Sequence, residues 1–358
     1  MTVTDALTIA LLVIICALLL LTLAVAAGHA VRIVYGRRMA RMEKRYAPLV
    51  IRLANEEETD EEAMRALVEL EPRQWSAARP VATRLLENLR GPARARIVDL
   101  FERRGVADQA IDDTRSRLPA TKARAAEVLG LLRHRPAVPE LRRLLRDRDS
   151  DVRQVATRAL GRVGDPAAVL PLMETLGAER PVPKHIVAQA VLRLGSSVLP
   201  ALTAAVDHTD ADVREVAIET LGMVGGHEAG PAIITALRGD DVAIVRVRAA
   251  GALGRLGLPS AEGPLLAATR DGDPAVRAAA VQALADLGAP AVPRIRELLG
   301  DPAYTVARAS ARSLLELGPS GREALEEADD LGASAELIAD EALAMAALGG
   351  KEEEEGDR

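Results

Sequence analysis

The sequence contains very few aromatic residues and almost no cysteine. Aromatic side chains make up 1% of its 358 residues, and its only cysteine is Cys16. A single cysteine cannot form a disulfide within one chain, and it cannot supply a thiolate cluster for a metal. Without aromatics, the core must consist of Ala, Leu and Val, which suits closely packed helices better than a β-sandwich.

Motifs that carry chemistry are also lacking. The five histidines do not pair at the spacing of metal ligands: His29, His134, His185, His208 and His227. No Gly-rich phosphate loop and no serine-elbow motif is present. We therefore expect no catalytic residue, no cofactor, no metal, no small-molecule substrate and no enzymatic activity. Nucleic acid is also not expected as a partner, because acids are interleaved at every turn of the repeats and Tyr304 is their only aromatic residue.

One short phrase recurs about seven times between Pro119 and Gly318. Its clearest copy is DVRQVATRALGRVG, from Asp151 to Gly164. The closing glycines follow one another at intervals of 30 to 32 residues: Gly164, Gly195, Gly225, Gly257, Gly288 and Gly318. An earlier copy closes on Arg133. A fixed period of this length is typical of a solenoid, so we predict an all-α solenoid over 119–318.

The regular positions of the phrase predict how its helices pack. Leucine or valine stands four residues before each closing glycine: Leu160, Val191, Leu221, Leu253, Leu284 and Leu314. Mostly small residues stand eight before it: Ala156, Val187, Ala217, Ala249, Ala280 and Ser310. These two sets share one helix face, and the glycine ends the helix in the left-handed conformation.

The second helix of each unit carries a proline that either starts the helix or kinks it. These residues are Pro139, Pro171, Pro200, Pro231, Pro264 and Pro293. Aspartates then cluster in the turn before the next phrase, where they can cap its helix. Examples are Asp149, Asp210 and Asp273.

A basic residue stands eleven places before six of the closing positions. The set is Lys122, Arg153, Lys184, Arg214, Arg246 and Arg277, and we call it the ladder. In a stacked solenoid these cations form a line along one face. Two interpretations stay open: structural pairing with turn aspartates, or a basic groove that binds an anionic partner.

The run AVLPLMETL, the turn acids and the pattern VRxxAxxALGxxG resemble HEAT-like repeats of the short bacterial type found in phycobilin lyases. The resemblance implies a helix-pair solenoid of about seven to eight units that serves as a scaffold, an adaptor or, in a few cases, an enzyme. His227-Glu228 is similar to the iron-binding pairs of the HEAT-like deoxyhypusine hydroxylases. That family needs several such pairs, and this sequence has one, so iron binding is not expected.

Residues 1–28 are predicted to form a membrane anchor. The run from Ala6 to Ala27 has 22 residues without a charge, which spans roughly 33 Å as a helix. The juxtamembrane segment 29–48 is basic, and its cations could contact lipid headgroups: Arg32, Arg37, Arg38, Arg41, Lys44 and Arg45. The positive-inside rule then places the amino terminus outside the inner (plasma) membrane and the repeats in the cytoplasm. A cleaved signal peptide is the alternative.

The remaining segments flank the array. Residues 49–118 are predicted to be degenerate repeats that cap its start, with Pro72, Pro80 and Pro92 marking helix starts. Trp75 and Phe101 there are either core residues or a binding anchor. Capping helices are expected over 319–350, stopped by Gly349-Gly350, and an acidic disordered tail over 351–358.

The anchor, the array and the missing motifs together suggest a function. We expect a membrane-anchored scaffold or adaptor that binds a protein partner, such as a membrane enzyme or transporter, on the cytoplasmic face. One alternative is a lyase-type HEAT-repeat subunit acting on a chromophore- or metal-bearing partner. A second alternative is a periplasmic binding module released by signal cleavage.

Overall fold

The structure is a computed structural model that describes residues 42–55, 61–288 and 291–356, with side chains up to residue 348. The described residues form helices and turns, and none of them forms a strand. They fall into two compact units that divide between Gln109 and Ala110. The predicted all-helical class is therefore confirmed. The predicted anchor, residues 6–27, lies outside the described residues.

The first unit is a small group of helices. It contains a helix over 42–54, α2 (Glu61–Val68), α3 (Pro72–Asn88) and α4 (Gly91–Arg103), and α5 (Val106–Asp113) follows across the division. Trp75 meets Phe101 edge to face with ring centroids 5.4 Å apart, and both side chains are buried. The two rings are therefore core residues of the unit, and their edge-to-face contact stabilises it.

Two of the three prolines expected to start helices do so. Pro72 and Pro92 lie in the first turns of α3 and α4. The expectation for Pro80 is wrong, because this residue lies inside α3. Pro80 is exposed, so the carbonyl that loses its backbone bond, that of Ser76, lies on the solvent side of the helix.

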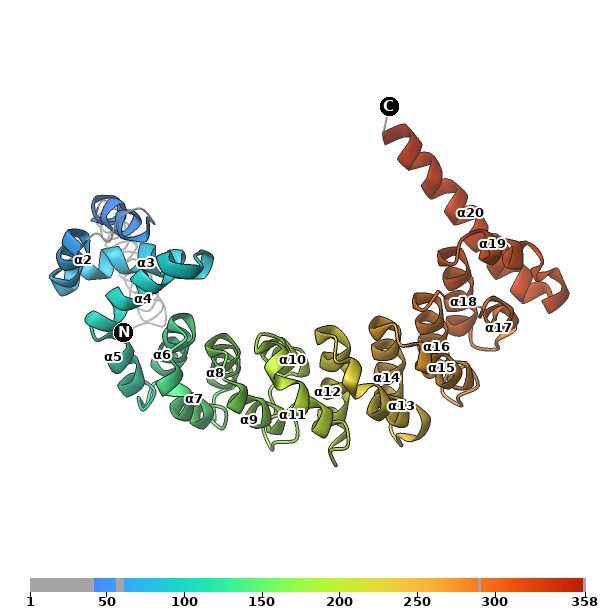
Figure 1. Cartoon of the computed structure of the whole chain (residues 1–358), viewed down its shortest axis with the longest axis horizontal. Coiled ribbons are helices and arrows are strands. Elements are labelled where there is room, and N and C mark those ends of the chain that lie inside the picture. The colour runs from blue at the N-terminus through green and yellow to red at the C-terminus, as the bar shows by residue number, and fades with distance from the viewer. Residues whose placement is uncertain (1–41, 56–60, 289–290, 357–358) are drawn as a thin grey trace, which may run out of the picture. The chain divides into compact units, whose positions relative to one another are not determined.

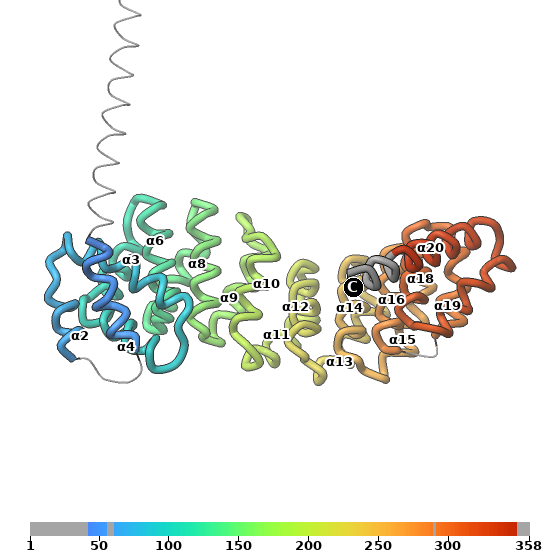
Figure 2. Tube along the Cα trace, turned by 90° about the horizontal axis from the view of Figure 1, so that it is seen from above, coloured from blue at the N-terminus to red at the C-terminus, as the bar shows by residue number. Residues whose placement is uncertain are grey.

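The second unit is a stack of helix pairs. Seven helices form its inner layer: α6 (Pro119–Leu132), α8 (Ser150–Val163), α10 (Lys184–Leu192), α12 (Ala211–Val224), α14 (Ala243–Leu256), α16 (Pro274–Asp286) and α18 (Tyr304–Glu316). Within this unit they lie side by side along the concave side of a curve (Figures 1 and 2). These are the helices that the recurring phrase predicts.

Six shorter helices form the outer layer on the convex side (Figure 1). They are α7 (Val138–Leu144), α9 (Val169–Glu174), α11 (Leu199–Ala205), α13 (Gly230–Gly239), α15 (Glu262–Ala268) and α17 (Val292–Glu297). Each recurring proline stands among the first three residues of its helix. These prolines therefore start helices rather than kink them, because the first turn needs no backbone donor.

The closing residues of the inner helices all have positive φ, and Arg133, Gly164, Gly225 and Gly257 adopt the left-handed helical conformation. Gly164 has φ 76° and Gly225 has φ 85°, and the other closing glycines are also positive. Arg133 is the only non-glycine residue with positive φ in the described part of the chain, at 53°. The predicted glycine stop is thus confirmed, and Arg133 holds the same conformation at a steric cost.

Contacts between successive inner helices depend on a second glycine position. It lies three residues before the closing one and is occupied by Gly130, Gly161, Gly222 and Gly254. A Cβ on Gly254 would lie 2.9 Å from the Cα of Ala283. A Cβ added to any of the other three glycines would approach an alanine of the next inner helix as closely: Ala159, Ala190 or Ala252. The backbones of neighbouring helices therefore touch at these places. α10 carries Leu192 at this position instead.

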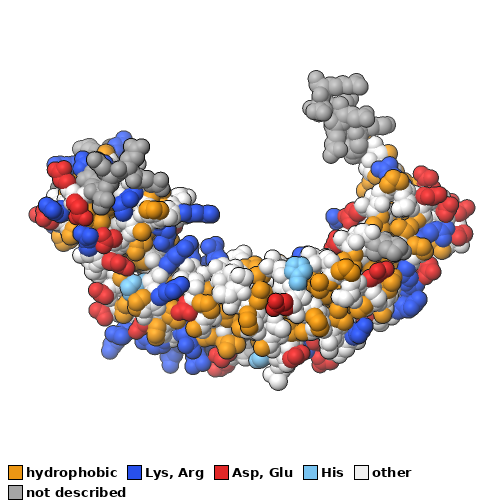
Figure 3. Space-filling model, in the orientation of Figure 1, with side chains coloured by type: hydrophobic (Ala, Val, Ile, Leu, Met, Phe, Trp, Pro, Cys, Tyr) orange, Lys and Arg blue, Asp and Glu red, His pale blue; other side chains and the backbone are white. Residues whose placement is uncertain are grey.

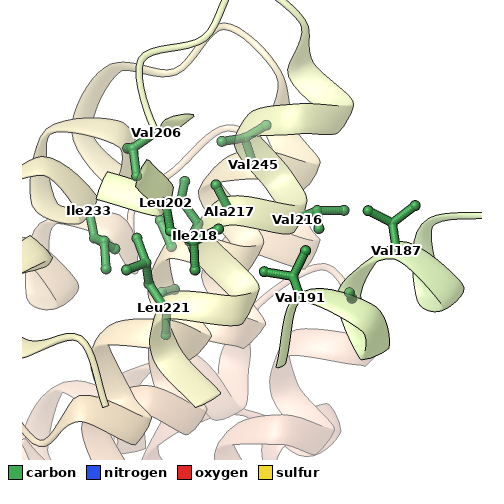
Figure 4. Packing of buried hydrophobic residues seen from close by; sticks show 14 of the residues in the cluster. Val187, Val191, Leu202, Val206, Val216, Ala217, Ile218, Leu221, Ile233 and Val245 are labelled. Atoms are coloured by element: carbon green, nitrogen blue, oxygen red, sulfur yellow. The ribbon is translucent and has the colours of Figure 1, made fainter. Parts of the chain in front are cut away.

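The core runs continuously between the two layers. All six leucine or valine positions and all six small positions named above are fully buried. Figure 4 shows Leu221 and Ala217 of α12 directed toward Leu202 and Ile233 of the outer layer. The helix face that the phrase predicts is therefore the buried face, as expected from i, i+4 spacing.

The array ends in α19 (Pro319–Glu326) and α20 (Ala333–Gly356), and α20 packs against α18 through the buried Ala335, Ala339 and Ala342. α20 continues through Gly349-Gly350, so the predicted stop there is wrong. A glycine costs only about 1 kcal/mol inside a helix, and the following Lys and Glu residues favour helix.

Among the residues that the structure describes, no single helix is long and apolar enough to cross a membrane. Only α10 together with Gly195–Ala205 reaches that length and composition, and this pair is bent by 117°.

Candidate functional site

The ladder residues lie in the first turn of the inner helices, and three arginines share one geometry. Arg246 donates from Nε and Nη2 to the two carboxylate oxygens of Asp271, both at 2.9 Å. Its Nη1 donates to the carbonyl of Asp240 at 2.8 Å. Arg214 binds Asp240 and Arg277 binds Asp301 in the same two-point manner. Each of these arginines therefore joins the turn before its own inner helix to the turn before the next inner helix.

The aspartates of a turn have two different roles. Asp271 accepts the ladder arginine and also the backbone N–H of Asp273 at 2.8 Å. Asp273 in turn caps α16 by accepting from the N–H of Ala275. Asp149 and Asp210 cap α8 and α12 in the same way, so the predicted caps are confirmed at these three residues.

These contacts shift the pKa values of both partners. The hydrogen bond from Arg246 holds the pKa of Asp271 below its usual value. Burial alone would raise the pKa of Asp240 and of Asp301, but hydrogen bonds from the ladder arginine and from a backbone N–H outweigh burial and lower it. The charged form is therefore the bound form in each pair.

Lys122 makes a simpler version of this contact. Its Nζ lies 2.5 Å from Asp147 Oδ2. Asp147 also accepts from the N–H of Asp149. Burial would raise the pKa of Asp147, but the hydrogen bonds from Lys122 and from this N–H lower it.

The other two ladder residues make different contacts. As in the other ladder arginines, the Nη1 of Arg153 donates to backbone carbonyls, here those of Asp147 and Arg148, both at 3.1 Å. Its Nε is buried and has no hydrogen-bond partner among the described residues. The aspartates bound by Lys122, Arg214, Arg246 and Arg277 follow them by 24 to 26 residues. At these separations from Arg153 stand Gly177, Ala178 and Glu179, and no described carboxylate binds the Arg153 side chain.

Lys184 uses a different set of acids. Its Nζ lies 2.6 Å from Asp212 and 2.7 Å from Glu215 on the next inner helix. Burial would lower the pKa of Lys184, but the two hydrogen bonds outweigh burial and raise it. Glu215 is 4% exposed and also accepts from Arg248 Nε at 3.1 Å. This buried carboxylate joins α10, α12 and α14, and periodicity gave no signal for it, because it occupies no regular position of the phrase.

The inner helices present a second, irregular set of side chains on the concave side. These stand six residues before each closing position: Glu127, Arg158, Gln189, Glu219, Gly251, Gln282 and Arg312. They are exposed or half-buried and vary in charge and size, whereas the buried positions hardly vary. Such a surface is suited to distinguishing one protein partner from another.

Of the cations predicted to contact lipid, only Lys44 and Arg45 lie in the described residues. Both are exposed on the helix over 42–54. Arg32, Arg37, Arg38 and Arg41 lie outside the described residues, so lipid contact stays a prediction.

His227 lies in a short turn, where its Nδ1 is 2.7 Å from the carbonyl of Gly225. In the described part of the chain, no three His, Cys, Asp or Glu side chains are grouped so that they could hold a metal.

The fold and the repeat geometry define a helix-pair solenoid protein. The chain belongs to the HEAT-repeat family, because residues 109–192, 171–246 and 230–316 match the family model for HEAT repeats. Together these matches cover more than half of the chain.

The chain is similar to several individual proteins. An uncharacterized phycocyanin operon protein Z of Pseudanabaena tenuis is 32% identical over 127 residues, which are 32% of this chain and 62% of that protein. The chain thus matches less than two thirds of this relative. The complex of CpcE and CpcF of phycocyanin lyase from Nostoc is 26% identical over 42% of this chain and 99% of that chain, with a TM-score of 0.39. Human deoxyhypusine hydroxylase is 19% identical over 78% of this chain and 97% of that chain, with a TM-score of 0.31.

These similarities correct two expectations. The expectation that the chain has no enzymatic activity is contradicted by its similarity to the phycocyanin operon protein. The expectation that it has no small-molecule substrate is withdrawn with it.

Proposed function

We propose that the repeat unit binds a protein partner along the concave side of its inner helices. The observation that carries this proposal is the contrast between invariant buried positions and the variable exposed set that includes Arg158, Gln189 and Glu219. Stacking explains the buried positions but not the exposed ones, which are free to match a partner. HEAT repeats in general mediate protein interactions.

Site-specific photo-crosslinking tests this surface. A crosslinking amino acid is placed at Arg158 or Gln189 on the inner helices, and at Leu170 or Thr235 on the outer helices as matched exposed controls. We expect the two inner positions to capture the same partner and the outer positions to capture little of it. Equal capture from both layers, or a different product at each inner position, would contradict the proposal.

A second proposal is that the bound partner carries a chromophore and that the chain acts as a lyase-type subunit. The similarity to the phycocyanin operon protein supports it. The test adds the purified chain to phycocyanin and follows the absorbance and the amount of attached chromophore over time. We expect a change that depends on the chain and is weakened by Gln189→Glu or Arg158→Glu. Identical spectra with and without the chain would reject this role for phycocyanin.

Residues 6–27 remain the basis of a third proposal, that an anchor holds the unit at the cytoplasmic face of the inner membrane. Their composition and the basic residues after them support it. The full chain and a version without residues 1–28 would be compared by membrane fractionation. A carboxyl-terminal tag that external protease removes from spheroplasts would instead favour the periplasmic alternative.

A further inference from the structure

The first two repeats of the second unit share an open groove of about 1210 Å³. It runs over the start of α6, the length of α7 and the end of α9. Six basic side chains line it: Arg117, Lys122, Arg142, Arg143, Arg146 and Arg148. Figure 3 shows Lys and Arg gathered on the convex edge in this region. The groove is separate from the concave side proposed above as a partner surface.

The acids of the groove leave most of this charge unbalanced. Asp147 is bound by Lys122, and Asp149 is used as the cap of α8. Glu174 lies 3.9 Å from Arg146, and both side chains are mostly exposed, so this pair holds neither group firmly. The guanidinium groups of Arg117, Arg142 and Arg148 make no hydrogen bond or ion pair with any described residue.

The charge is specific to this repeat. Residues 133–148 contain six arginines against Glu140 and Asp147, whereas the corresponding residues of the next repeat, 164–178, contain no basic residue. Stacking cannot explain the difference, because α7 and α9 occupy equivalent places in the outer layer (Figure 1). The arginines of α7 are therefore available for a ligand.

We propose that this groove binds an acidic segment of a partner protein. The basic residues lie at the start of α6, on α7 and in the turn that follows α7. A segment with several Asp or Glu residues can neutralise these separate cations, whereas a single small anion neutralises only a part of them. The lining residues include no aromatic side chain, which argues against a nucleic-acid strand.

Fluorescence anisotropy tests the proposal with a labelled peptide of eight glutamates and a matched peptide of eight glutamines. We expect only the glutamate peptide to bind, with an affinity that falls as salt is added. The double variant Arg142→Glu with Arg148→Glu should weaken binding at least ten-fold. The matched control, Arg238→Glu with Arg270→Glu on the outer layer of later repeats, should change it less than two-fold. Binding of neither peptide, or equal losses in both double variants, would overturn the proposal.

Competition with phosphate separates an acidic segment from a free anion. Displacement of the glutamate peptide by phosphate, at an ionic strength at which sodium chloride does not displace it, would overturn the acidic segment and indicate a site for a free anion.

Discussion

Arg153 and Arg246 occupy equivalent places in the second and fifth repeats but have different surroundings. Arg246 is neutralised by an aspartate of the turn before the next inner helix, as are Arg214 and Arg277. Arg153 donates to backbone carbonyls, and no described carboxylate binds it. The comparison shows that the later repeats use their ladder charge internally, whereas the second repeat leaves a buried cation without its carboxylate. A regular sequence pattern therefore does not guarantee a uniform surface.

The largest expected effect concerns the close helix contacts of the regular repeats. Gly254→Leu would force a side chain into the backbone of Ala283, so we expect the free energy of unfolding to fall by about 3 kcal/mol. Leu192→Met at the equivalent place in α10, where the chain already accepts a large side chain, should cost less than about 1.5 kcal/mol. Urea denaturation measures both, and a Gly254→Leu protein as stable as wild type would show that the helices do not touch there.

The next effect compares the two kinds of ladder position directly. Arg246→Ala leaves the carboxylate of Asp271 without its cation and should lower the free energy of unfolding by about 2 kcal/mol. Arg153→Ala removes bonds to backbone carbonyls only, so we expect a loss of about 1 kcal/mol. Urea midpoints at low salt measure the difference. A larger loss in Arg153→Ala than in Arg246→Ala would contradict the assigned contacts.

A smaller effect is expected at the residue that closes α6. Arg133 adopts φ 53°, a conformation in which the other inner helices use glycine. Arg133→Gly should therefore stabilise the protein by about 1 kcal/mol, whereas Gly164→Arg should destabilise it by a similar amount. Thermal unfolding of the two variants would show shifts of opposite sign, and shifts of the same sign would argue against backbone strain at Arg133.

The smallest expected effect is a change in the pH dependence of folding stability. The pKa of Asp271 is lowered in the folded state, so its pairing stabilises the fold above the unfolded pKa of about 3.9. This stability is lost as pH falls through that value toward the folded pKa. Asp271→Asn should therefore be less stable at pH 7 and should lose less on acidification. Melting temperatures between pH 7 and pH 3 test this, and parallel curves for the two proteins would count against the pairing.

Much of the fold was predictable because stacking imposes the same requirement on every repeat. Leu160 and Gly164 could be assigned from their spacing alone, since one fills the seam and the other ends the helix. Pro80 was misjudged because a proline on the solvent side of a helix is tolerated, and its burial is not visible in a sequence. Gly349-Gly350 failed as a stop because helix formers follow it.

The candidate sites were less predictable because they depend on departures from the pattern. The ladder was visible as six basic residues, but the lack of a carboxylate partner at Arg153 became visible only by comparison with the contacts of Arg246. Glu215 became significant only when Lys184 and Arg248 were seen to bind it together.

The glycine–alanine contacts also set a distance scale for any partner on the concave side. Helices that touch through glycine pack near the short end of the usual 8–10 Å range, so one residue of the set containing Arg158 and Gln189 is presented at about that interval. An extended chain advances about 3.3 Å per residue, so two to three residues of such a chain span one repeat. A partner that binds in an extended form along the repeats is therefore expected to present a matching side chain every two to three residues.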